Sequence, residues 1–283
     1  MSEMKLIKAA TPIKIPPAAF NKINYTAITW LASAGFLVNC RGTIIFIDPV
    51  LTTIPGQDNL SETGLKMSIP YPIKADEVPK ATAILYTHPD SDHLGPKTAV
   101  TLASLGPCFI GPHTVFRQLA CLGVNPGLID TCRVGDKIKI NDIIVEVTPA
   151  DHPWQLQDPA RCGKPFRSGD CCGFILTTPD GRFFFPGDTR LMEEHLLITD
   201  IDVLALDVSL CAYHLNHPGA IVLANSLSDA LLIPIHYGTY DAPGKAAHCG
   251  DPADVFSKVV DAERRSRVLG PGQALKIKNR LEL

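Results

Sequence analysis

The chain has 283 residues, of which 46% are hydrophobic and 19% charged, so it can bury a sizeable core as one large domain or two small ones. Its formal net charge of −3 argues against a general nucleic-acid binder, whose surface would be basic. The chain contains no run of about 18 apolar residues, so no membrane span is expected.

The N-terminal segment scatters lysines and prolines and has no continuous apolar stretch, so no secretory signal is expected. Residues 1–25 are expected to form an arm ahead of a single domain over 26–283. The nine cysteines are odd in number and include no C-x-x-C pair. We therefore expect reduced thiols and a cytoplasmic protein.

Short apolar runs bounded by turn residues predict strands in the first half of the chain, at 27–31, 43–47, 83–86 and 108–110. The stretch 52–80 is rich in Gly, Pro and polar residues and is expected to be a long surface loop, which is often functional. Helices are expected over 97–105 and 114–122, each ended by a glycine.

The second half of the chain begins with two predicted hairpins, 137–140 with 143–147 and 173–178 with 182–185. Strands at 203–206 and 232–235 and helices over 218–230 and 252–265 follow. Hairpins thus dominate each half, without the regular β-α-β-α rhythm of a parallel doubly wound sheet. We therefore expect a layered α/β fold with two mixed sheets and helices outside.

The most informative segment is THPDSDH, which follows the strand expected at 83–86. It places His88, Asp90, Asp92 and His93 within six consecutive positions. Crowding two imidazoles and two carboxylates is costly unless a cation holds them, and such nitrogen and oxygen donors suit one or two divalent metals. Alone, however, a motif of this length is weakly specific.

Three further predicted strands also end in a metal-capable side chain. His152 follows the strand at 143–147, Asp188 follows the strand at 182–185, and His236 follows the strand at 232–235. Strand ends are rigid and can hold ligands in fixed positions. Four such segments in this order predict a metal centre.

The order THPDSDH, His152, FPGDT around Asp188 and IPIHYGTY around His236 resembles the metallo-β-lactamase superfamily. TWLASAGFLV and GTIIFIDPVL are similar to its opening strands, and VLGPGQALKI to its closing segment, so the resemblance covers roughly residues 26–278. CGFILTTPDGR, FFPGDT and IPIHYGTY look most like its L-ascorbate 6-phosphate lactonase-like branch, which also resembles the phospholipase D acting on N-acylethanolamine phospholipids. The resemblance implies a four-layer αββα sandwich of two mixed β-sheets with helices on the outer faces.

Carried over residue by residue, the resemblance implies two metal positions. The first is held by His88, Asp90 and His152, the second by Asp92, His93 and His236, and Asp188 bridges both. A hydroxide between the metals is the implied nucleophile, because coordination lowers the pKa of water to about 7. Asp92 would orient that hydroxide and shuttle a proton, and Asp48 would support the ligands from behind.

One position departs from the family pattern H-x-H-x-D-H, because Asp90 stands where the second His is expected. The same wording, H-P-D-x-D-H, is similar to the nuclease domain of competence-type DNA-uptake proteins. An oxygen donor at this position shifts preference towards Mn²⁺, Fe²⁺ or Mg²⁺ and away from Zn²⁺. The expected cofactors are two divalent ions per chain, Mn²⁺ or Zn²⁺, with Fe²⁺ as a further candidate.

Five side chains are candidates for contact with the substrate. They are Arg190, Lys164 and Arg167, which could bind a phosphate or carboxylate, and His217 and Tyr237. Each has an alternative interpretation: solvated charge for the cations, a helix N-terminus for the segment with His214 and His217, and core packing for Tyr237. His113, His195 and His248 are expected to be ordinary surface or capping residues.

The expected activity is metal-dependent hydrolysis of an ester, lactone or phosphoester bond in a small anionic molecule, with a preference for a lactone because the resemblance is nearest there. One alternative is a phosphodiesterase, nuclease or phospholipase-like enzyme that uses the same metals. Another is a non-hydrolytic protein on the same fold, either an iron oxidoreductase or a regulatory metal-binding protein. No nucleic-acid partner is expected, and self-association into a homo-oligomer is common in the branch that the chain resembles.

Overall fold

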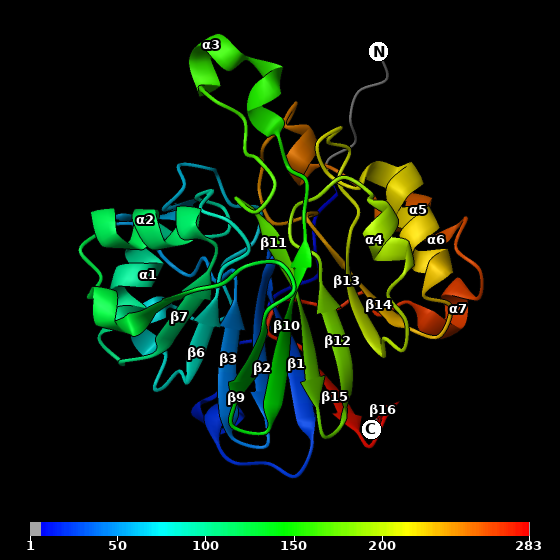
Figure 1. Ribbon diagram of the computed structural model, residues 1–283, viewed down its shortest axis with the longest axis horizontal. Helices are drawn as coiled ribbons and strands as arrows, with labels where there is room; N and C mark the ends of the chain where they lie inside the picture. Colours follow the sequence, from blue (N-terminus) through cyan, green and yellow to red (C-terminus); the bar gives the residue numbers. More distant parts are fainter. Residues whose placement is uncertain (1–6, 283) are drawn as a thin grey trace.

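Two mixed β-sheets pack face to face at the centre of the computed structural model, and helices cover both outer faces (Figure 1). The predicted four-layer αββα arrangement is therefore confirmed. The structure describes residues 7–282, so the first six residues of the expected arm and residue 283 of the expected domain lie outside the described residues.

The first sheet has eight strands in the order β16-β15-β1-β2-β3-β6-β7-β8. Neighbours from β16 to β3 run antiparallel, whereas β3, β6, β7 and β8 run parallel. The bounds are β1 (Thr26–Ala32), β2 (Gly35–Cys40), β3 (Thr43–Ile47), β6 (Ala83–Leu85), β7 (Cys108–Gly111), β8 (Ile129–Thr131), β15 (Ala274–Lys278) and β16 (Leu281–Glu282).

The second sheet has six strands in the order β14-β13-β12-β11-β10-β9. They are β9 (Lys137–Ile140), β10 (Ile143–Pro149), β11 (Cys172–Thr178), β12 (Gly181–Phe185), β13 (Val203–Asp207) and β14 (Leu231–Ile235), which confirms both predicted hairpins. β10 and β12 are both antiparallel to β11, and β13 and β14 run parallel to β12. β10, β12, β13 and β14 therefore share one direction, and their carboxyl ends meet at one edge of the sheet.

The helices divide between the two outer faces (Figure 1). α1 (Pro96–Ala103) and α2 (His113–Cys121) cover the first sheet. α4 (Glu193–Leu196), α5 (Asn216–Ser226), α6 (Pro252–Phe256) and α7 (Ala262–Arg265) lie beside the second sheet. The prediction of one continuous helix over 252–265 is wrong, because residues 257–261 form a turn between α6 and α7, at the end of which Asp261 takes a left-handed φ of 53°.

Alternation along the strands of the first sheet builds two apolar layers. In β2, Phe36 and Val38 face the second sheet, whereas Leu37 faces the helical layer of α1 and α2. The ring centroid of Phe36 lies 5.0 Å from that of Phe185 in β12. Both faces of this sheet are thus buried, which explains why its strands are continuous apolar runs.

The remaining segments lie against the sandwich. The long loop expected at 52–80 contains a small hairpin of β4 (Thr53–Ile54) and β5 (Gln57–Ser61). The described part of the arm is also packed: the Ala9 N–H donates to the Gly238 carbonyl at 3.1 Å, and Phe20 is buried. Short 3₁₀ turns complete the chain at η1 (Pro17–Phe20), η2 (Ala75–Glu77), η3 (Pro126–Leu128), η4 (Trp154–Gln157) and η5 (Ala246–His248).

Candidate metal centre

All seven predicted ligands lie just beyond the carboxyl ends of strands. The motif His88 to His93 follows β6, while His152, Asp188 and His236 follow β10, β12 and β14. The two sheets meet at this edge, so segments about 150 residues apart in the sequence converge there. The structure thus brings together the predicted ligand residues, and it adds Asp207, His214 and His248 to them.

Asp188 lies at the middle of the cluster and presents its two oxygens to different imidazoles. Oδ1 lies 3.1 Å from His93 Nε2 and 2.8 Å from His236 Nε2. Oδ2 lies 3.9 Å from His88 Nε2 and 3.7 Å from His152 Nε2. The carboxylate therefore faces one predicted metal position with each oxygen, as a bridging ligand would.

A glycine next to Asp188 permits this placement. Gly187 has a φ of 67°, and a Cβ at this position would lie 2.7 Å from Thr87 Cβ in the motif segment. Both the left-handed backbone and the close approach of the two segments therefore require a residue without a side chain.

Four imidazoles are held in the same way. Their Nδ1 atoms lie within hydrogen-bond distance of fixed oxygens: His88 with Thr87 Oγ1 (2.9 Å), His93 with Asp48 Oδ2 (2.8 Å), His152 with the Tyr213 carbonyl (3.0 Å) and His214 with Asp207 Oδ2 (2.6 Å). When such a ring is neutral and donates its Nδ1 proton to one of these oxygens, the lone pair of Nε2 is directed towards the cluster. This is the arrangement in which a protein presents imidazole to a metal.

Asp48 and Thr87 form the support beneath the motif. The Thr87 backbone N–H donates to Asp48 Oδ1 at 2.8 Å, and the Thr87 hydroxyl donates to Asp48 Oδ2 at 2.7 Å. Asp48 itself has a φ of 45°, an uncommon value for a non-glycine residue and one that concentrates at functional sites. The structure therefore places Asp48 behind His93, on the side away from the cluster.

The remaining two motif carboxylates lie at the mouth of the cluster. Asp90 Oδ2 lies 3.3 Å from His88 Nε2 and 3.5 Å from His152 Nε2, which places it at the first predicted metal position. Asp92 Oδ2 lies 3.7 Å from His248 Nε2 and shares a potential metal-binding group with His236 and His248.

The charges of this cluster depend on one another. Burial alone would raise the pKa of Asp188, but the nearby imidazoles, led by His214 and His236, hold it well below its usual range. Burial likewise disfavours a charged imidazole, yet Asp188 and Asp48 raise the pKa of His93 well above its ordinary value. Carboxylates that remain ionised in a buried site require a positive partner, which protons on imidazoles or a bound cation can supply.

The donor set fits divalent metals on an observation independent of the motif. Nε2 of His88, His93 and His236 and Oδ1 of Asp188 are buried and have no hydrogen-bond partner of good geometry in the described part of the chain. Buried lone pairs that converge in this way are costly unless a cation occupies the space between them. Mixed nitrogen and oxygen donors suit Zn²⁺, Mn²⁺ and Fe²⁺.

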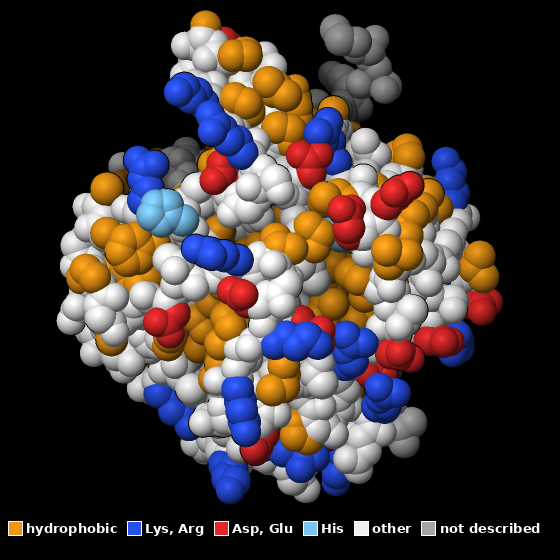
Figure 2. Space-filling model, viewed as in Figure 1, with side chains coloured by type: hydrophobic (Ala, Val, Ile, Leu, Met, Phe, Trp, Pro, Cys, Tyr) orange, Lys and Arg blue, Asp and Glu red, His pale blue; other side chains and the backbone are white. Residues whose placement is uncertain are grey.

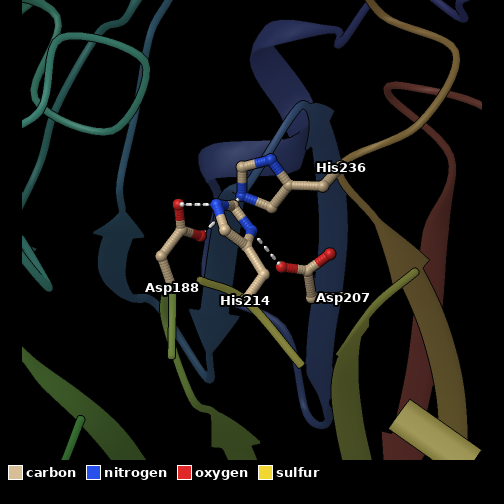
Figure 3. A group of neighbouring side chains, drawn as sticks. All are labelled: Asp188, Asp207, His214 and His236. Atoms are coloured by element: carbon tan, nitrogen blue, oxygen red, sulfur yellow. Dashed lines mark hydrogen bonds and ion pairs between the residues drawn. The ribbon is translucent and has the colours of Figure 1, made fainter. Parts of the chain in front are cut away.

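Sequence reasoning missed three members of the cluster. His214 lies between Asp188 and Asp207, 3.2 Å from Asp188 Oδ2 (Figure 3). His248, expected to be an ordinary surface or capping residue, is not on the surface: it is buried beside Asp92, and burial lowers its pKa to about 4. Asp207 is the last residue of the apolar strand β13, and Asp48 directly follows the apolar strand β3. This shared pattern of an Asp at the end of an apolar strand is a signal that could have identified Asp207.

A cleft of about 310 Å³ opens onto the cluster and is lined by Asp90, Asp92, His152, Asp188, His214 and His248 together with Thr63, Leu65, Ser91, Trp154, Gln157, Cys211, Lys245 and Ala247. Thr63 and Leu65 belong to the long loop expected at 52–80, which therefore forms part of the wall. Lys245 is the one Lys or Arg among these lining residues.

None of the five candidate substrate contacts lines this cleft. Arg190 pairs with Asp151 at 2.5 Å. His217 lies in the first turn of α5, and its Nε2 is 3.1 Å from the Val208 carbonyl. Tyr237 is buried and stacks on Trp30 with ring centroids 5.3 Å apart, so it packs the core. Lys164 and Arg167 are exposed on the protruding segment that carries α3 (Pro159–Cys162), where Figure 2 shows cationic side chains on the outer surface.

Two further expectations concern the whole chain. Across residues 7–282, none of the helices combines the length and the apolar composition that a membrane span requires. All nine cysteines lie within this range and are free thiols.

The fold and the strand-end cluster define a class of protein. Residues 43–237 match the family model described as a Beta-lactamase superfamily domain, and this range is more than half of the chain. The chain therefore belongs to the metallo-β-lactamase superfamily.

Within this superfamily the chain is similar to the UPF0173 metal-dependent hydrolases. It is 30% identical over 258 residues to the one from Pyrobaculum arsenaticum, covering 88% of this chain and 99% of that relative. It is 31% identical over 245 residues to the one from Archaeoglobus fulgidus, covering 83% and 91%. The structure of Igni18, a metallo hydrolase from Ignicoccus hospitalis, shares the fold, with a TM-score of 0.63, 22% identity and coverage of 89% of this chain and 97% of that one.

Proposed function

We propose that this protein is a metal-dependent hydrolase whose centre holds two divalent ions, one on each side of Asp188. The observation that carries the proposal is the common orientation of four imidazoles, whose Nδ1 atoms face fixed oxygens while their Nε2 atoms face the cluster. The UPF0173 relatives are named metal-dependent hydrolases, which supports the same conclusion.

The first position comprises His88, Asp90 and His152 with Asp188 Oδ2, and the second comprises Asp92, His93 and His236 with Asp188 Oδ1. Divalent ions bound there would lower the pKa of a water molecule and polarise the carbonyl or phosphoryl oxygen under attack. Asp92 lines the cleft and is assigned the role of orienting the attacking water and accepting its proton. Asp48 and Asp207 fix the rings of His93 and His214.

The cleft favours a small anionic substrate with an ester, lactone or phosphoester bond. Its volume of about 310 Å³ suits a small molecule, and Lys245 on its wall supplies a positive charge for a carboxylate or phosphate. Lys245 thus replaces Arg190, Lys164 and Arg167 as the candidate cation for the substrate. The likeness to the lactonase-like branch favours a lactone within this class.

A substrate panel tests the proposal. Protein reconstituted with Mn²⁺ or Zn²⁺ is assayed against sugar-phosphate lactones, small carboxylic esters and phosphodiesters, with Asp188→Asn as the inactive variant. We expect metal-dependent turnover of a small anionic ester or lactone, reduced at least about 100-fold in Asp188→Asn, because each metal loses its shared ligand.

The matched control is Asp170→Asn, a change of the same type on the protruding segment outside the cleft, which should retain full turnover. Turnover that persists in Asp188→Asn would contradict the proposed centre. Turnover of nucleic acid in place of small esters would contradict the proposed substrate class.

A further inference from the structure

Trp154 connects the metal centre to the segment that protrudes from the molecule. Residues 153–170, here called the flap, leave the end of β10 just after His152 and return to β11 (Figure 1). Trp154 is half-buried in η4 at the base of the flap and lines the cleft.

The indole N–H of Trp154 donates to Asp90 Oδ2 at 2.7 Å. The same oxygen is the one that lies 3.3 Å from His88 Nε2 and 3.5 Å from His152 Nε2. Besides Trp154 and these two imidazoles, no side-chain donor in the described part of the chain lies within hydrogen-bond distance of this carboxylate. The hydrogen bond therefore fixes the oxygen that points into the first metal position.

A hydrogen-bond donor such as the Trp154 indole can hold the Asp90 carboxylate in one orientation. An imidazole ligand is fixed by the acceptor at its Nδ1, as His88 and His152 are, but a carboxylate has no second ring nitrogen to hold. Asp90 can rotate about its Cβ–Cγ bond unless a donor fixes one oxygen. Indole suits this role because it only donates, so it holds the carboxylate without competing for a metal.

A second flap residue covers the same position. The Phe166 ring lies 6.2 Å from that of His88 and 6.4 Å from that of His152, measured between centroids. Its backbone N–H donates to Gln155 Oε1 at 3.0 Å, which ties the returning limb of the flap to the limb that carries Trp154. Both limbs of the flap thus converge on the first metal position.

We propose that Trp154 is the positioning residue for Asp90: its indole N–H aims Oδ2 of that carboxylate at the first metal position, and the flap is thereby coupled to metal binding. This inference rests on the metal centre proposed above. It assigns Trp154 a role that a histidine at position 90 would not need, because a ring ligand is oriented through its own Nδ1.

The test measures metal affinity and not turnover. The metal-stripped full chain is titrated with Mn²⁺, and the free ion is followed by its electron paramagnetic resonance signal. Trp154→Phe keeps the aromatic ring and removes the N–H, and we expect it to weaken one of the two Mn²⁺ sites by about 10-fold. Leu156→Ala, an exposed flap residue outside the cleft, is the matched control and should bind Mn²⁺ like the wild type.

A double-mutant cycle shows whether Trp154 acts through Asp90. With Asp90→His in the background, Trp154→Phe should change Mn²⁺ affinity by less than about threefold, since the carboxylate that it orients is gone. An unchanged affinity in Trp154→Phe alone, or an equal loss in both backgrounds, would overturn the proposal. If Asp90→His itself removes one Mn²⁺ site, the cycle is replaced by the unfolding temperature of metal-free Trp154→Phe. A temperature like that of the wild type supports the positioning role. A fall of more than about 4 °C would indicate that Trp154 acts on the stability of the fold and would overturn the proposal.

His88→Ala separates this inference from the proposed function. Loss of a Mn²⁺ site in His88→Ala together with unchanged binding in Trp154→Phe would reject the positioning role and leave the metal centre intact. Unchanged binding in His88→Ala would reject the centre itself.

Discussion

Asp48 shows how one carboxylate can organise a whole motif. It receives two hydrogen bonds from Thr87 and faces the Nδ1 atom of His93, so the start of the motif and its last imidazole share one anchor. The residue is buried and adopts a left-handed backbone conformation, which persists only where the surrounding contacts impose it.

Replacement of Asp48 by Asn should weaken metal binding while the fold is retained. An amide oxygen carries no full charge and holds the Nδ1 proton of His93 less firmly, so Nε2 becomes a poorer ligand. We expect a loss of metal affinity of about 10- to 100-fold, measured by competition with a chromophoric chelator. Asp130→Asn, at a half-exposed strand away from the cleft, is the control, and an Asp48→Asn variant with wild-type affinity would contradict the support role.

The residue scale also shows what a sequence can reveal about a site. His88 to His93 form a local motif whose composition suits a metal site, and the three further strand-end residues make it a prediction. His214 and His248 do not, because each is a lone histidine whose partners, Asp207 and Asp92, are brought close only by the fold. Tyr237 is a plausible pocket residue by its place beside His236, but its ring stacks on Trp30, a partner about 200 residues away that the local sequence does not reveal.

At the scale of elements, Asp180 ties the lower ends of the two sheets. It lies in the turn between β11 and β12, and its carboxylate accepts hydrogen bonds from Thr26 in β1 and from Arg41 at the turn between β2 and β3. The Asn279 backbone N–H, between β15 and β16, donates to it as well. This turn therefore joins the start of β1 and two hairpin turns of the first sheet to the second sheet.

The stability that Asp180 contributes should depend on pH. Burial alone would raise its pKa, but Arg41 and Thr26 outweigh that effect and lower it. A carboxyl group with a depressed folded-state pKa stabilises the fold above its unfolded pKa of about 3.9, and this stabilisation is lost as the pH falls through the folded value. The free energy of unfolding of Asp180→Asn should thus lie below that of the wild type at pH 7, and the gap should narrow below about pH 4.

Urea unfolding at several pH values measures that gap. Asp142→Asn, in the exposed turn of the neighbouring hairpin β9–β10, should show little difference at any pH. A gap for Asp180→Asn that stays constant down to pH 2 would contradict the assignment.

Arg265 joins the last two helices to the core. Its fully buried guanidinium donates to carbonyls at the end of α5, Ala224 at 2.6 Å and Leu227 at 2.8 Å, and to Ala230 before β14 at 3.0 Å. These are carbonyls that a helix end leaves without partners. Arg265 thus acts as a C-terminal cap supplied from a distant segment.

Substitution of Arg265 by Met should lower the free energy of unfolding by about 3 kcal/mol, because buried carbonyls lose charge-assisted hydrogen bonds. Thermal unfolding checks this value, with Arg264→Met, an exposed neighbour in the same short helix, as the control. Equal unfolding temperatures for Arg265→Met and the wild type would contradict the capping role.

Strands were easier to predict than helices, because their signal is local in the sequence. Apolar runs such as Thr43–Ile47 are bounded by turn residues and need no distant partner to be recognised. The segment 252–265 carries helical composition throughout, yet a turn at 257–261 interrupts the helix, and beyond it the guanidinium of Arg265 donates to a carbonyl at the end of α5. That contact lies about 40 residues away in the sequence and leaves no local signal.

For the whole molecule, topology converts these local features into a site. The carboxyl ends of β10, β12, β13 and β14 lie at one edge of the second sheet, and β3 and β6 run parallel in the first, so both sheets deliver polar side chains to the same edge. The αββα sandwich and the positions of the candidate ligands at strand ends could be predicted from the sequence. The shape of the cleft, the flap and the charge on the cleft wall required the three-dimensional arrangement of the chain.

The most direct test of the central claim is an anomalous difference map from crystals of the full chain soaked in Mn²⁺. The account predicts two peaks on either side of Asp188, one contacted by His88 and His152 and the other by His93 and His236. A map with no peak among these residues, or with Mn²⁺ bound only elsewhere on the molecule, would contradict it.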